Sequence, residues 1–290
     1  MLAARLQSGP RVTRRYTLAF ATIAVAAALA LVYWDVLTGL AVQWSHDSDY
    51  SHGFLVLPLA AYFTYQRRSR LRLAPVRPTA WGLAIVGSGF VIFAAGVAAA
   101  DLFLARVSLL PVVAGCVLFL FGAAHLRVLM FPLLFLLLMV PLPAIVFNDV
   151  TVPLQLIASH VGELALRTAG VPLVREGNVL ELVGIRLEVA EACSGIRSVV
   201  ALLMFGITFS QFSGPSRLRV LGLALATIPV AVLTNGARVA GTGLAAHVWG
   251  PVAARGFLHT ASSAVAFCLA VLLLVGVARV GRTAAASTVR

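Results

Sequence analysis

The sequence predicts an all-α polytopic membrane protein with about eight transmembrane helices. Of its 290 residues, 61% are hydrophobic and only 11% are charged, whereas soluble domains carry about 25% charged residues. Apolar stretches long enough to cross a bilayer recur along the chain, and basic residues gather in alternate connections between them. Together these observations exclude an ordinary soluble domain.

A span needs about 20 apolar residues. By that criterion the expected spans lie near residues 17–34, 53–65, 80–100, 102–123, 128–147, 194–212, 219–240 and 260–280. The second is short, and LTGLAVQW before it is a candidate re-entrant or interfacial piece, so seven and nine spans are alternatives. We expect a basic cytoplasmic tail over 1–16, one transmembrane domain over 17–281 and a short cytoplasmic tail over 282–290.

Charge predicts the orientation of these spans. The 22 basic residues are all arginine and the net charge is +12, which would suggest nucleic acid only if the charge lay on a folded polar surface. Here the arginines lie in short loops, so no nucleic-acid partner is expected. With the N-terminus inside, the cytoplasmic arginines are Arg5, Arg11, Arg14, Arg15, Arg67, Arg68, Arg70, Arg72, Arg77, Arg127, Arg217, Arg219, Arg279, Arg282 and Arg290. The acidic residues fall on the opposite side or at its edge, as the positive-inside rule predicts.

The longest non-cytoplasmic segment, 148–192, has its own organisation. Its first part, TVPLQLIASHVGELALRTAG, has mixed helical periodicity and predicts an interfacial helix. Its last part, VLELVGIRLEVAEA, alternates apolar and charged positions around Gly184, which predicts a short β-hairpin. That hairpin would deliver the chain directly to Cys193.

Three reactive or charged residues, Cys193, Arg238 and His259, fall at the same end of the last three predicted spans. A helix start and a nearby positive charge favour the thiolate form of a cysteine, and Gly195 would let a substrate backbone approach. Arg238, with Asn235 one turn earlier, is costly within a membrane unless it serves a function. Histidine suits proton transfer near neutral pH.

Each of these residues also has a structural alternative. Cys193 could be a small residue at a helix start, Arg238 could extend to the interface, and His259 could be an interfacial polar residue. Convergence at one membrane face favours a joint site. The other cysteines, Cys116 and Cys268, lie in the middle of apolar runs and predict no disulfide framework.

A fourth polar cluster, WSHDSDYSHGFL, precedes the second predicted span. Its histidines and aspartates are metal-ligand types, but they lack an established ligand spacing, so no metal is expected. Substrate docking or structural hydrogen bonding is the preferred interpretation.

Four motifs resemble those of the exosortase/archaeosortase family: EACSGIRS around Cys193, TNGARV around Arg238, GFLH ending at His259, and DYSHG from Asp49 to Gly53. The resemblance implies a cysteine peptidase or transpeptidase of the bacterial inner membrane that needs no cofactor. Its partners would be exported proteins with a C-terminal sorting signal, which consists of a Pro-Glu-Pro-like motif, a transmembrane helix and a basic tail (PEP-CTERM). The active site would face the periplasm and both termini the cytoplasm.

By this resemblance Cys193 is the nucleophile that forms an acyl-thioester, and Arg238 and His259 divide proton transfer and oxyanion stabilisation. Because arginine stays charged, we assign the oxyanion to Arg238 and the proton to His259; the reverse assignment stays open. The supporting or substrate-binding residues expected around them are Ser194, Gly195, Arg197, Asn235, Asp49, Tyr50 and His52. The chain departs from the family at Ser263, where glycine is common.

Two other functions are alternatives. An exopolysaccharide export component or a membrane acyltransferase would not need Cys193, and a binding-only relative would hold sorting signals without cleaving them. A serine intramembrane protease is disfavoured because no GxSG-type motif occurs. The sequence does not indicate which acceptor resolves the acyl-thioester: water, an amine or a hydroxyl. It does not indicate the oligomeric state either.

Overall fold

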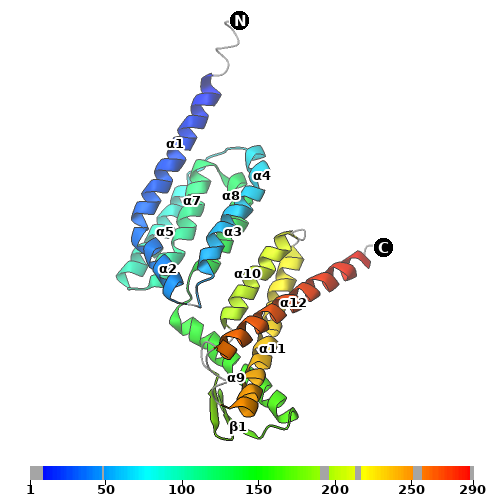
Figure 1. Ribbon diagram of the computed structural model, residues 1–290. Coiled ribbons are helices and arrows are strands. Elements are labelled where there is room, and N and C mark those ends of the chain that lie inside the picture. Colours follow the sequence, from blue (N-terminus) through cyan, green and yellow to red (C-terminus); the bar gives the residue numbers. More distant parts are fainter. Residues whose placement is uncertain (1–8, 48, 190–195, 213–216, 251–256, 288–290) are drawn as a thin grey trace. The chain divides into compact units, whose positions relative to one another are not determined.

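A computed structural model describes residues 9–47, 49–189, 196–212, 217–250 and 257–287 (Figure 1). Of the described residues, 81% are helical, which agrees with the all-α class. The chain divides into two compact units, Met1–Pro141 and Leu142–Arg290, which we call unit 1 and unit 2. Each is described by itself below.

Unit 1 is entirely helical in its described part. Its elements are α1 (Gly9–Val32), α2 (Trp34–His46), α3 (Gly53–Gln66), α4 (Arg68–Leu73), α5 (Trp81–Ala98), α6 (Leu102–Val107), α7 (Leu109–Leu120), α8 (Ala123–Phe135) and a 3-10 helix, η1 (Leu136–Met139). Helices α5 and α7 pack closely because Gly82 and Gly115 bring their backbones together: a Cβ on Gly115 would lie 2.7 Å from the Val86 nitrogen. Small residues allow such close approach between membrane helices.

A sharp bend of 66° separates α1 from α2. Tyr33 lies at the bend, fully buried, and its hydroxyl lies 2.9 Å from Ser108 Oγ at the junction of α6 and α7. The piece LTGLAVQW, predicted to be re-entrant or interfacial, belongs to α2, the second arm of this broken helix.

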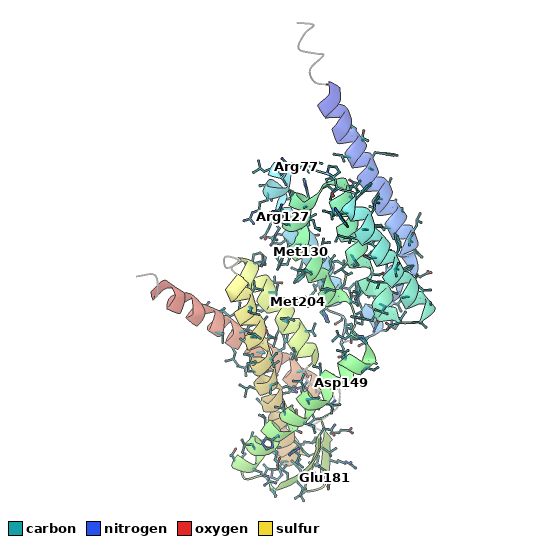
Figure 2. All side chains as sticks on the ribbon, turned by 180° about the vertical axis from the view of Figure 1, so that it is seen from behind. Arg77, Arg127, Met130, Asp149, Glu181 and Met204 are labelled. Carbon is teal, nitrogen blue, oxygen red and sulfur yellow. The ribbon has the colours of Figure 1, made fainter. Side chains whose placement is uncertain are left out.

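Basic residues gather at one end of unit 1. Helix α4 contributes Arg68, Arg70 and Arg72, and Figure 2 shows Arg77 and Arg127 at this same end. The Arg77 backbone N–H donates to the Phe121 carbonyl at 3.0 Å, so two of the predicted cytoplasmic connections are joined directly.

The predicted count of eight membrane spans is not confirmed. In the described part of the chain, the helices long and apolar enough to cross a bilayer are Trp81–Ala98, Leu102–Leu120, Ala144–Thr168, Val220–Trp249 and Ala261–Arg279, and the bent pair α1–α2 would make a sixth. The predicted spans 53–65 and 194–212 correspond to shorter helices of 14 and 17 residues.

The predicted span 128–147 is wrong at its end. The helical run stops at Met139, and a new helix begins at Ala144. Pro141 and Pro143 lie between them, and a proline lacks the N–H that a continuing helix needs.

Unit 2 combines helices with a small sheet. Its elements are α9 (Ala144–Thr168), β1 (Leu173–Glu176), β2 (Val179–Leu182), β3 (Ile185–Glu188), α10 (Ile196–Phe212), α11 (Arg217–Trp249) and α12 (Phe257–Ser287). The predicted hairpin is confirmed: β2 and β3 pair antiparallel, with Leu182 opposite Ile185 and Gly184 at φ +74° in the two-residue turn. Strand β1 was not predicted, and it completes an antiparallel sheet of order β1-β2-β3.

Helix α9 begins seven residues before the predicted interfacial helix at 151–170 and ends two residues before its end. It is also long and apolar enough to cross a membrane, so the prediction that it lies in the interface is not confirmed. Glu163 connects it to the sheet, because the carboxylate accepts a hydrogen bond from Arg175 Nε of β1 at 2.7 Å. Arg167 Nη2 lies 2.9 Å from its other oxygen. The sheet is therefore anchored to α9 by charge as well as by apolar packing.

Candidate functional site

Helix α11 runs through two different environments. Its first half packs in a bundle with α10 and α12, where Val230 and Ala231 join Leu202 and Ala270 in one buried cluster. Its second half packs on α9 and the sheet, where Val239 joins Ala158, Leu166, Val171, Leu180, Leu182 and Val189. The change of environment falls between Ala231 and Val239, which is where Asn235 and Arg238 lie.

Glycines determine how closely α9 and α11 approach at this level. A Cβ on Gly236 would collide with the Val161 side chain, and a Cβ on Gly162 would lie 2.7 Å from Val239 Cγ1. Further along, a Cβ on Gly243 would lie 2.7 Å from Leu166 Cδ1. The two helices therefore run side by side in the same direction, with contact surfaces that admit no side chain at these points.

Arg238 is half-buried, and its Nη1–H donates a hydrogen bond to Ser263 Oγ of α12 at 2.9 Å. This bond joins two helices whose residues are 25 positions apart in the sequence. A hydrogen bond to a charged group is stronger than one between neutral groups, so it restricts where the guanidinium can lie. The sequence indicated Ser263 only as a departure from a resembling family; its bond to Arg238 was not predicted.

Asn235 lies one turn before Arg238 on α11 and is 95% buried, with a relative exposure of 5%. Thr234 beside it is also buried, and its hydroxyl donates to the Val230 carbonyl at 2.8 Å. A buried amide needs hydrogen-bonding partners. The fold therefore restricts the orientation of the Asn235 side chain, as the predicted supporting role requires.

The other predicted residues of this site are placed to different extents. Cys193, Ser194 and Gly195 lie outside the described residues. Arg197 falls in the first turn of α10, and His259 falls in the first turn of α12, four residues before Ser263. In the described part of the chain, the structure thus brings together Arg238, Ser263 and the backbone of the turn that carries His259.

The segment that contains Cys193 has defined ends. Before it, the Val189 N–H donates to the Asn178 carbonyl at 2.9 Å, and Val189 is buried in the same cluster as Val239. After it, α10 begins at Ile196 and packs on α11 and α12.

The DYSHG motif makes its described contacts within unit 1. His52 Nε2 lies 3.0 Å from the Leu138 carbonyl oxygen, which can only accept, so Nε2 carries the proton. Trp44 Nε1–H donates to the neighbouring Met139 carbonyl at 3.0 Å, and Gly53 packs directly on the Trp44 ring. These contacts attach the start of α3 to η1, which favours the structural interpretation of His52.

Burial lowers the pKa of His52, although hydrogen bonds with Leu138 and Asp49 and the Asp49 charge oppose this effect. The imidazole is therefore held in its neutral form near neutral pH. The Asp49 N–H donates to Asp47 Oδ1 at 2.9 Å, so Asp47 shapes the turn that carries the motif. Tyr50 packs near His52, with ring centroids 6.3 Å apart.

In the part of the chain that the structure describes, no group of three or more His, Cys, Asp or Glu side chains could hold a metal ion. His46 instead uses its Nδ1 locally, 2.9 Å from the Val42 carbonyl.

Comparison with protein families gives a match over most of the chain. The family model described as Transmembrane exosortase (Exosortase_EpsH) matches residues 44–276, more than half of the chain. That range contains Cys193, Arg238 and His259 as well as the DYSHG motif. Searches of curated proteins and of solved structures each found no match. From the match to the family model, the chain belongs to the transmembrane exosortase family.

Proposed function

We propose that this protein is a membrane cysteine peptidase or transpeptidase that cleaves the C-terminal sorting signal of exported proteins. Membership of the exosortase family supports a role in membrane protein sorting in general. The finer proposal is that the signal carries a Pro-Glu-Pro-like motif, a transmembrane helix and a basic tail, and that Cys193 forms an acyl-thioester with it.

In the first step the Cys193 thiolate attacks the scissile carbonyl carbon, and a carbon–sulfur bond forms. The negative charge that develops on the carbonyl oxygen is stabilised by the Arg238 guanidinium, which stays charged at any physiological pH. His259 gives a proton to the leaving amine as the carbon–nitrogen bond breaks. The C-terminal helix of the signal leaves, and the exported protein remains attached to Cys193 as a thioester.

In the second step an acceptor attacks the thioester carbonyl and the cysteine leaves as thiolate. His259 takes the proton from the acceptor, so the enzyme returns to its starting state. Water as the acceptor gives proteolysis, and an amine or hydroxyl gives transfer of the protein to another molecule. The proposal covers both outcomes, because the thioester is common to them.

The observation that supports this proposal best is the hydrogen bond from Arg238 to Ser263. It fixes the guanidinium of α11 against α12 one turn after His259, at the level where the apolar bundle gives way to the sheet-bearing part of unit 2. Electrostatic stabilisation of a transition state depends on such preorganised donors. A guanidinium that merely reached the interface would not need a serine on a neighbouring helix.

Processing of a tagged sorting-signal protein in cells tests the proposal. Cys193→Ala, Arg238→Ala and His259→Ala are compared with the wild type at matched expression, with Cys268→Ala as the control cysteine. We expect Cys193→Ala to abolish cleavage, and a hydroxylamine-sensitive adduct to accumulate only when Cys193 is present. Unchanged cleavage in Cys193→Ala would refute the thioester mechanism.

A further inference from the structure

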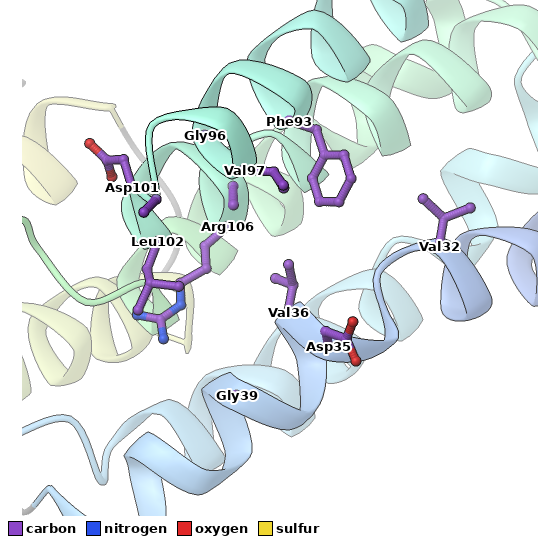
Figure 3. A pocket seen from close by; sticks show the side chains of 12 residues that line it. Val32, Asp35, Val36, Gly39, Phe93, Gly96, Val97, Asp101, Leu102 and Arg106 are labelled. Carbon is purple, nitrogen blue, oxygen red and sulfur yellow. The ribbon is translucent and has the colours of Figure 1, made fainter.

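Unit 1 contains a pocket of about 480 Å³ where the α1–α2 bend faces the connection from α5 to α6 (Figure 3). Its walls are mainly apolar and include Val36, Phe93 and Val97. Gly39 of α2 also lines it, and a Cβ built there meets nothing within 4 Å. The absence of a side chain at Gly39 is therefore part of what leaves the pocket open.

Arg106 of α6 lines this pocket and is 93% buried, with a relative exposure of 7%. It lies inside the apolar helix Leu102–Leu120, one of those able to cross a membrane. Among the described residues it has no hydrogen-bond or ion-pair partner. Tyr50 of the DYSHG motif is within electrostatic range, but a phenol is neutral at neutral pH. A charged group within a membrane span is costly unless it serves a function.

The two acidic residues of the pocket, Asp35 and Asp101, differ in their hydrogen bonding. Asp101 caps α6, because its Oδ1 accepts hydrogen bonds from the Phe103 and Leu104 N–H groups at 2.9 and 3.1 Å. The Asp35 carboxylate has no partner among the described residues, and no ion pair joins it to Arg106. Figure 3 shows Arg106 and Asp35 on opposite sides of the pocket. The pocket thus presents one unpaired cation and one unpaired anion across apolar walls.

We propose that this pocket binds a phospholipid with a zwitterionic phosphate–ammonium head group. Its phosphate would lie on Arg106, whose guanidinium can donate two parallel hydrogen bonds to phosphate oxygens. Its primary ammonium would lie on Asp35. The acyl chains would follow Val32, Val97 and Leu102, which are exposed apolar side chains on the pocket's rim.

Charge and shape together favour this ligand class. An anionic head group would satisfy Arg106 but would place a second negative charge near Asp35. A free phosphate would leave the apolar walls unfilled, and contact with apolar surface contributes to affinity only when an apolar part of the ligand covers it. A head group with a quaternary ammonium cannot donate a hydrogen bond to Asp35.

The test measures lipid-dependent thermal stabilisation of the full-length protein purified in mild detergent, because a bound ligand raises the melting temperature. The probes are phosphatidylethanolamine, phosphatidylcholine, phosphatidylglycerol, inorganic phosphate and the water-soluble glycerophosphoethanolamine. We expect phosphatidylethanolamine to bind at least about tenfold more tightly than every other probe, since each of the others loses one contact with Arg106, Asp35 or the apolar walls.

Four variants address the three parts of the pocket separately. Arg106→Gln is expected to weaken phosphatidylethanolamine binding about tenfold or more, and Arg106→Lys less than that. Asp35→Asn is expected to abolish the preference over phosphatidylglycerol while leaving phosphate recognition in place. Gly39→Leu is expected to reduce binding by filling the pocket without changing its charges. The control is Arg127→Gln, which neutralises an exposed arginine of the same unit outside the pocket.

Equal stabilisation of the wild type and Arg106→Gln by phosphatidylethanolamine would overturn the proposal. Phosphatidylglycerol that binds as tightly as phosphatidylethanolamine would overturn the preference for a zwitterionic head group. Glycerophosphoethanolamine that binds as tightly at the same concentration would overturn the role of the acyl chains. Melting temperatures without added lipid show whether each variant is folded. Removal of an unpaired buried charge is expected to leave that value unchanged or raise it.

Discussion

At the scale of single residues, the structure gives Ser263 a specific task. Its hydroxyl accepts the Arg238 Nη1–H at 2.9 Å, so an arginine that could take many rotamers is held in one direction. Arginine loses a large rotamer entropy when it is ordered. The hydrogen bond to Ser263 contributes to this ordering before the reaction begins, which makes Ser263 a positioning residue in the proposed mechanism.

We therefore expect Ser263→Ala to lower kcat by about tenfold with little change in KM, because one hydrogen bond to a charged group is lost. Ser263→Thr keeps a hydroxyl and is expected to restore much of the rate. The control is Ser88→Ala, since Ser88 is exposed in α5 and its hydroxyl donates only to the Ile85 carbonyl of its own helix at 2.8 Å. Equal rates for Ser263→Ala and the wild type would contradict the positioning role.

His52 leads to a prediction about pH. Burial lowers its pKa in the folded protein, whereas in the unfolded chain the value is about 6.5. The neutral imidazole is the form that the fold favours, so the stability that it contributes is present above the unfolded pKa and is lost as pH falls toward the folded pKa. The melting temperature of the wild type should therefore fall between pH 7.5 and 5.5. In His52→Gln this fall of the melting temperature should be smaller than in the wild type.

At the scale of elements, the contact between α9 and α11 depends on glycines that face side chains. Gly236 packs on Val161, and Gly162 packs on Val239, so each helix offers a glycine to a valine of the other. This reciprocal arrangement places Asn235 and Arg238 beside the sheet-bearing part of unit 2. A change in the spacing of α9 and α11 would move both residues.

Gly236→Ala is expected to destabilise the protein by about 1–3 kcal/mol, because the new methyl group collides with Val161 and forces the helices apart. Gly241→Ala is a matched control on the same helix, since a Cβ there meets nothing within 4 Å. The control should be neutral or more stable by about 1 kcal/mol at most, from the better helix propensity of alanine. Unfolding in detergent, followed by helical circular dichroism, compares the two variants.

At the scale of the whole molecule, the charge distribution predicts which parts of the chain lie on each side of the membrane. Arg77, Arg127 and the arginines of α4 lie at one end of unit 1, where we expect the cytoplasm (Figure 2). The sheet of unit 2 lies in the segment that the same rule assigns to the opposite side. Its hairpin turn exposes Val183, with a relative exposure of 77%.

Labelling with a membrane-impermeant thiol reagent tests this topology. In a chain with Cys116, Cys193 and Cys268 changed to alanine, a cysteine at Val183 should react in intact spheroplasts. A cysteine at Leu73, which is 86% exposed at the end of α4, should react only after the membrane is opened. If the cysteine at position 73 alone reacts in intact spheroplasts, the orientation is the reverse of the one assigned here. If both cysteines react, the assignment of the two positions to opposite sides is wrong.

The sequence by itself determined the membrane character, the four motifs and the hairpin around Gly184. These properties are local: apolar content, charge in loops and alternation along four-residue strands are present in the chain before it folds. Strand β1 was not predicted because Leu173–Glu176 lacks such a local signal. It forms a strand by pairing with β2.

Only the tertiary structure decided where the α1–α2 helix bends and which polar residues meet. Tyr33 holds the α1–α2 bend through Ser108, 75 residues away, and Ser263 holds Arg238 from another helix. The unpaired charge of Arg106 beside an open pocket is likewise a property of four packed helices. No window of sequence contains these contacts, because each depends on surfaces that become neighbours only when distant helices pack.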